Sequence, residues 1–120
     1  MVDQRFHKSC RLLDSLAFER VFNNPDFRVS NKYFLILGYW SELDTARLGV
    51  IVAKKHIARA TQRNRIKRQV REAFRTRKLA LGSADLVVMA RKGLQLVENS
   101  ECRSYIHDLM EEIEKKKPSH

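Results

Sequence analysis

The chain holds 120 residues with a mass of 14.1 kDa, and its 24 basic and 14 acidic residues give a net charge of +10. This is the size of one small domain, and a hydrophobic content of 43% suffices for one core and excludes a disordered chain. No apolar run reaches the roughly eighteen residues of a membrane span, and no signal-peptide block opens the sequence. Cys10 and Cys102 are too few for a disulfide framework or a structural zinc site, so we expect a cytoplasmic protein.

We expect a single domain over residues 1–120, with a basic arm at 1–11 and a frayed tail at 117–120. Asp14 or Ser15 is placed to cap a helix that ends near residue 23. Two apolar stripes compete on this helix, Ala17 with Val21 and Phe18 with Phe22. A helix on one core needs a single stripe, so the second either widens the core face or faces a cleft.

Strand patterns follow this helix. Residues 27–40 are rich in β-branched and aromatic side chains, and residues 47–53 form a second apolar run, which we expect to pair with the first in antiparallel fashion. A further strand at 24–29 is weakly indicated. Residues 84–90 are nearly all apolar, which is typical of a buried strand.

The charge excess is concentrated in residues 54–78, where eleven basic residues and one acid give a net charge of +10. A helical core stripe of period 3.6 predicts a helix over 63–78 whose opposite face is cationic. The stripe consists of Ile66, Val70, Ala73 and Phe74, and a cationic row of Arg63, Lys67, Arg71 and Arg75 runs along the helix. Asn64 is placed to cap it, and Arg68 to pair with Glu72.

Such a ridge indicates a polyanionic partner, because like charges crowded together repel one another and phosphates relieve that repulsion. The alternative is a solvated face that aids solubility. A last helix is expected over 99–116, with an apolar stripe and an acidic outer face.

Residues for a protein-borne active site are sparse. None of the four histidines forms a metal-binding pair with a second histidine or a cysteine at the usual spacing, and the four glycines are too dispersed for a phosphate loop. Asp85 and Asp108 could bind a metal in principle, but we favour the simpler interpretation of an acid at a strand edge and one on a helix surface. We therefore predict neither catalytic nor metal-binding residues in this chain.

Several motifs together resemble the protein component of bacterial ribonuclease P. Arg63-Asn64-Arg65 and the basic residues after it are similar to the RNR signature of that family. The strands at 47–55 and 85–91 and the paired phenylalanines at 18–22 are similar to other family motifs, in the same order. The segment between Lys55 and Arg63 departs from the pattern, because many members have a shorter, glycine-containing link there.

The resemblance implies an α+β fold, a two-layer α/β sandwich of order αβββαβα with a left-handed βαβ crossover, like the second domain of ribosomal protein S5. It also implies a division of labour. The RNA subunit would hold the catalytic site and most of the Mg²⁺, and would hydrolyse precursor tRNA to release its 5′ leader. The protein would be the accessory subunit of this endoribonuclease, with no small-molecule substrate.

By the same resemblance, RNA contacts would come from the signature helix and the segment before it, namely Arg63, Asn64, Arg65, Lys67, Arg68, Arg71, Lys54 and Lys55. Phe18 and Phe22 would line a cleft for the single-stranded leader, since bases stack on aromatic planes. Both phenylalanines could instead be plain core residues. Two alternative functions stay open, an RNA-binding module of a ribosomal or ribosome-assembly complex and a nuclease active without an RNA subunit.

Overall fold

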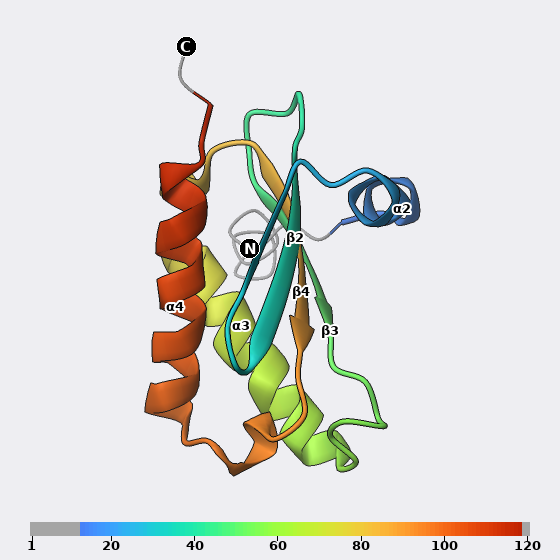
Figure 1. Cartoon of the computed structure of the whole chain (residues 1–120), viewed down its shortest axis with the longest axis vertical. Coiled ribbons are helices and arrows are strands. Elements are labelled where there is room, and N and C mark those ends of the chain that lie inside the picture. Colours follow the sequence, from blue (N-terminus) through green and yellow to red (C-terminus); the bar gives the residue numbers. More distant parts are fainter. Residues whose placement is uncertain (1–12, 119–120) are drawn as a thin grey trace, which may run out of the picture.

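The computed structural model of the chain describes residues 13–118 (Figure 1). The predicted arm at 1–11 and the last two residues of the predicted tail lie outside this part. The element order is α2 (Ser15–Asn23), β1 (Phe27–Ser30), β2 (Phe34–Trp40), β3 (Arg47–Ile51), α3 (Ala60–Leu81), β4 (Ala84–Ala90), a 3₁₀ turn η1 (Leu94–Leu96) and α4 (Asn99–Lys115). This confirms the expected order αβββαβα. None of these helices is long and apolar enough to cross a membrane.

The four strands form one mixed sheet in the order β1-β2-β4-β3. The predicted pairing of the strands at 34–40 and 47–51 is wrong, because β4 lies between them, antiparallel to β2 and parallel to β3. The apolar run of β4 explains its central place, since five of its first six positions are fully buried and a strand covered on both faces belongs inside a sheet. The weakly indicated first strand is present, shifted to Phe27–Ser30.

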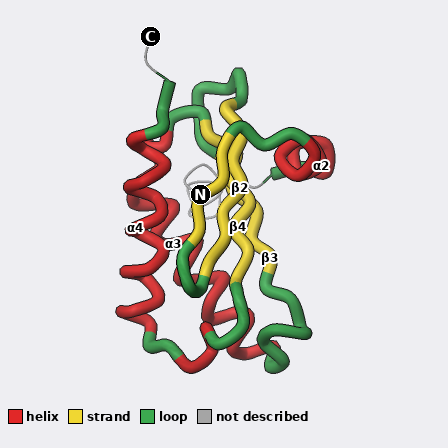
Figure 2. Tube along the Cα trace, viewed as in Figure 1, coloured by secondary structure: helices red, strands yellow, loops and turns green. Residues whose placement is uncertain are grey.

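Helices cover the two faces of the sheet unequally. In Figures 1 and 2, α3 and α4 pack side by side on one face, and α2 alone lies on the other. The main core fills the space under α3 and α4, where Phe34, Ile36, Leu48, Leu86 and Val88 point from the sheet toward Phe74 and Met110. Much of the opposite face is therefore left without a covering helix.

Three rows of side chains cross that opposite face, as the strand registers show. The first row is Leu35, Met89 and Ile51, the second is Leu37, Val87 and Gly49, and the third is Tyr39, Asp85 and Arg47. These rows form the surface on which α2 lies, since α2 contacts β2 and β4 on this face and its Phe18 lies against Gly49 of the second row.

The basic helix is longer than predicted. It begins at Ala60, after Arg59 as N-cap, and ends before Gly82, whose φ of 67° is easily adopted only by glycine. Its 22 residues span about 33 Å. Asn64 therefore lies inside the helix, and its predicted role as a cap is wrong. The first helix, by contrast, is capped as expected, since the Asp14 carboxylate accepts a hydrogen bond from the Ala17 amide at 2.9 Å.

Candidate nucleic-acid interface

The outward side of α3 carries four neighbouring polar residues, which we call the α3 face: Asn64, Lys67, Arg68 and Arg71. Ile66, Val70 and Phe74 are fully buried, so the amphipathic pattern fixes the rotation of the helix as predicted. Asn64 and Arg68 are exposed, and Lys67 and Arg71 are half-buried. Among the described residues no side-chain hydrogen bond or ion pair engages these four, so their polar groups are available to a partner.

Arg65, the second arginine of the signature, is used inside the protein. Its guanidinium donates to the carbonyls of Gln95 (3.3 Å) and Val97 (3.2 Å) and to the side chain of Asn99 (2.6 Å). A further bond joins it to Gln62 on its own helix at 2.8 Å. Arg65 thus ties the first turns of α3 to η1 and the start of α4.

Arg63 has a similar internal role at the segment between β3 and α3. Its guanidinium donates to the carbonyls of Ile57 (3.1 Å) and Ala58 (2.7 Å), and the Ile57 side chain is buried in the core. These contacts fix the segment that carries Lys54 and Lys55, both of which are exposed. The two lysines are therefore presented beside the start of α3.

Further along α3 the charged residues pair with acids. Glu72 pairs with Arg75 rather than with Arg68, so the predicted Arg68–Glu72 pair is wrong. The hydrogen bond from Arg75 lowers the pKa of Glu72 below its usual value. Arg77 turns toward α4 and pairs with Glu111 and Glu114. Cationic groups are thus left open mainly on the first half of the helix.

Both stripes of α2 have a place on the sheet. Ala17 and Val21 are buried against it, and Phe18 and Phe22 form the second stripe with ring centroids 5.7 Å apart and an interplanar angle of 20°. Phe18 packs over Gly49, where a Cβ atom would lie 2.4 Å from the Phe18 ring. Phe22 is 42% exposed, so at least this ring is more than a core residue.

An apolar groove of 310 Å³ lies on the same face of the sheet. Its floor is the row of Leu35, Met89 and Ile51, and polar atoms at its edge come from Lys55, His56 and Arg91. Of these residues only Lys55 was predicted as a contact. Strand alternation indicates the floor, but the approach of His56 and Arg91 depends on the parallel pairing of β3 with β4.

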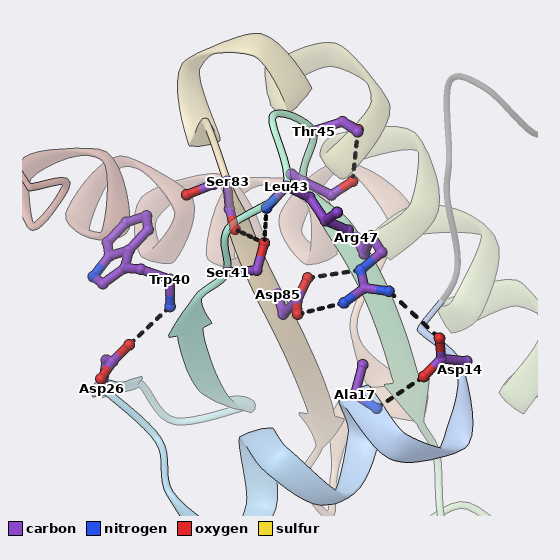
Figure 3. Close-up of polar contacts among 11 residues, drawn as sticks. Asp14, Ala17, Asp26, Trp40, Ser41, Leu43, Thr45, Arg47, Ser83 and Asp85 are labelled. Atoms are coloured by element: carbon purple, nitrogen blue, oxygen red, sulfur yellow. Dashed lines mark hydrogen bonds and ion pairs between the residues drawn. The ribbon is translucent and has the colours of Figure 1, made fainter.

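Asp85, the strand acid considered for a metal, has another partner (Figure 3). Both of its oxygens accept hydrogen bonds from Arg47, from Nε at 2.9 Å and from Nη2 at 2.8 Å, and Asp85 is fully buried. The same bonds raise the pKa of Arg47. Asp108 is an exposed acid on α4. The described residues contain no cluster of three or more histidine, cysteine or acidic side chains that could hold a metal.

Known proteins of one family are similar to this chain in sequence and in fold. The sequence profile of the family described as Ribonuclease P matches residues 6–114. The Ribonuclease P protein component of Pseudomonas entomophila (strain L48) is 40% identical over 119 residues, 99% of this chain and 90% of the relative. That of Marinobacter nauticus is 44% identical over 92% of this chain and 83% of the relative. The RNase P protein from Thermotoga maritima superimposes with a TM-score of 0.74 at 31% identity, covering 86% of this chain and 97% of that structure.

Proposed function

Because this chain belongs to the ribonuclease P protein family, whose members are accessory subunits of a tRNA-processing endoribonuclease, we propose that it binds two RNA partners through separate surfaces. The α3 face, with Lys54 and Lys55, binds the catalytic RNA subunit. The groove beside α2, with Phe18 and Phe22, binds the 5′ leader of precursor tRNA. The family match favours this function over a ribosome-assembly role.

The α3 face is suited to folded RNA because it is rigid and cationic. Arginine and lysine side chains on one helix can follow a line of phosphates, and the arginine fork matches phosphate oxygens. The charged groups of Lys67, Arg68 and Arg71 make no hydrogen bonds or ion pairs with other described residues, whereas the guanidinium groups of Arg63 and Arg65 do. We therefore assign Arg63 and Arg65 the role of holding the surface in place, and Lys67, Arg68 and Arg71 the contacts to phosphate.

The groove is suited to single-stranded RNA because it combines flat apolar surfaces with cations at its edge. Bases can stack on Phe22 and rest on the floor of Leu35, Met89 and Ile51, while Arg91 meets the phosphates of the leader. The exposed Phe22 ring is the observation that carries this assignment, since a helix packed on one core does not require it.

In this division of labour the RNA subunit cuts the precursor and binds most of the Mg²⁺, and the protein positions the leader. Neutralising phosphates at the α3 face also lowers the repulsion between the RNA subunit and its RNA substrate. We place this work in the cytoplasm, where the buried Cys102 remains a thiol.

Reconstitution with the RNA subunit tests the leader assignment. Phe22→Ala should raise KM for precursor tRNA about tenfold, since one stacked base contributes about 1–3 kcal/mol. The matched control is Leu79→Ala, which removes another exposed apolar side chain, 91% exposed at the far end of α3. A precursor trimmed to a single leader nucleotide should show no difference between Phe22→Ala and the unmodified chain. Equal KM for the full-length leader would show that Phe22 does not contact it.

A further inference from the structure

A second cavity lies on the other side of α2 from Phe18 and Phe22. Helix geometry places Leu16 and Arg20 on the side of α2 away from the two phenylalanines. There they line a 460 Å³ pocket together with Tyr39, Glu42 and Leu43. This pocket lies at the third row of the sheet, where Arg47 and Asp85 stand beside Tyr39, whereas the apolar groove lies at the first row. Helix α2 thus separates two cavities of different chemistry.

Apolar surface at this pocket is unusually exposed. Leu16 is 74% exposed and Leu43 is 44% exposed, and both line it. They come from different elements, Leu16 from α2 and Leu43 from the turn between β2 and β3. Side chains of this kind can pack against the flat faces of a heterocycle.

The polar groups of the pocket have opposite charges and spare hydrogen-bonding capacity. The Arg20 guanidinium lies 5.3 Å from the centre of the Tyr39 ring. No hydrogen bond or ion pair with another described residue uses the side chains of Arg20 or Glu42. Glu42 supplies an acceptor pair and Arg20 a donor fork.

Two further residues of the pocket lining, Arg47 and Asp14, belong to an ion-pair network that includes the buried Asp85 (Figure 3). Arg47 is 12% exposed and bonds Asp85 through Nε and Nη2, and its Nη1 lies 3.6 Å from Asp14 Oδ2. The other Asp14 oxygen caps α2. This network fixes Arg47 and Asp14, so the pocket walls are held before any ligand arrives.

We propose that this pocket binds a guanine base. Guanine presents two adjacent donors, N1–H and the 2-amino group, which a carboxylate such as Glu42 can accept together. Its O6 and N7 are acceptors, and the arginine fork of Arg20 matches them in the usual way. Adenine has no such donor pair, and cytosine and uracil lack an acceptor pair like O6 and N7.

The base can come from single-stranded RNA or from a free guanine nucleotide, since both present the same edges. The pocket is separate from the groove proposed for the leader, so this inference does not depend on that assignment.

Titration of the full-length chain with guanosine tests the proposal. The readout is the NMR chemical shift of the backbone amides of Tyr39 and Leu43. Guanosine is uncharged, so it does not bind the basic surface through phosphates. We expect saturable shifts with guanosine, and binding of inosine, which lacks the 2-amino group, and of adenosine to be weaker by about tenfold or more. Glu42→Gln should weaken guanosine binding by about tenfold, because one oxygen acceptor becomes a donor. The matched control is Glu112→Gln, on the exposed side of α4, which should change nothing.

A uridine pentanucleotide with one central guanosine, compared with all-uridine RNA of equal charge, identifies the source. If the Leu43 amide shifts with the guanosine-containing RNA, but neither with all-uridine RNA nor in the Glu42→Gln chain, the base comes from RNA. If guanosine binds but the guanosine-containing RNA causes no such shift, the ligand is a free nucleotide. The proposal is overturned if neither probe shifts these amides, if adenosine binds as well as guanosine, or if Glu42→Gln has no effect. Cleavage of precursor tRNA with a full-length leader by the Glu42→Gln holoenzyme tests the function proposed above separately from guanine binding.

Discussion

Replacing Arg65 with alanine separates a structural role for this residue from direct contact with RNA. The substitution removes the bonds that join α3 to the carbonyls of Gln95 and Val97 and to Asn99. Both carbonyls then lose a charged donor. Because they are part-buried, water replaces that donor only incompletely. A buried polar group left without a partner costs about 1–3 kcal/mol. Arg65 is itself half-exposed, which lets water replace part of the loss, so we expect about 1–3 kcal/mol in total.

Urea unfolding followed by circular dichroism measures this loss. With a slope of about 1–3 kcal/mol per molar urea, the midpoint for Arg65→Ala should fall by about 1 M. The control is Arg68→Ala, an exposed residue of the same helix whose loss should cost about 0.5 kcal/mol or less.

Affinity for the RNA subunit, measured against salt concentration, supplies the second readout. Each lost phosphate contact lowers the slope of log affinity against log salt by about 0.7–0.9. Arg65→Ala should leave this slope unchanged, and Arg68→Ala should lower it by about 0.7–0.9, the value for one phosphate contact. An Arg65→Ala chain of normal stability with a reduced slope would refute this reasoning and place Arg65 on the RNA.

Three further experiments test the packing. Phe74→Ala should cost about 3–5 kcal/mol in urea unfolding, because the Phe74 ring is fully buried under the sheet; a cost under about 1 kcal/mol would contradict that burial. Gly49→Ala should cost about 1–3 kcal/mol in urea unfolding, because a Cβ atom there would lie 2.4 Å from the Phe18 ring, and the second change Phe18→Leu should recover part of this loss; equal stability of all three chains would contradict the close contact. In a Cys10→Ser chain, the thiol of Cys102, whose pKa burial raises, should react with a disulfide reagent at pH 8 only after denaturation, and rapid native labelling would contradict its burial.

Local sequence patterns predicted the elements well and their partners poorly. The apolar run at 84–90 and the stripe of α3 each identify an element, because burial acts on the residues of that element alone. Which strands pair depends on contacts between distant segments, and the place of β4 between β2 and β3 could not be predicted from adjacent apolar runs. The hand of the crossover remains a prediction.

The residues proposed for RNA binding show the same limit. The α3 face follows from the helical period, so Lys67, Arg68 and Arg71 could be predicted together. The internal role of Arg65 could not, because its partners Gln95 and Val97 lie thirty or more residues further along the chain. The start of α3 was also misplaced, since residues 60–62 carry no large apolar side chain, and that error produced the false cap at Asn64.

The most direct measurement of the central claim is the salt dependence of binding between the RNA subunit and a chain with three substitutions, Lys67→Ala, Arg68→Ala and Arg71→Ala. If these side chains of the α3 face contact phosphates, the slope of log affinity against log salt should fall by about 2–3 relative to the unmodified chain. The circular dichroism spectrum should stay the same. An unchanged slope in a folded triple variant would contradict the claim that this face binds the RNA.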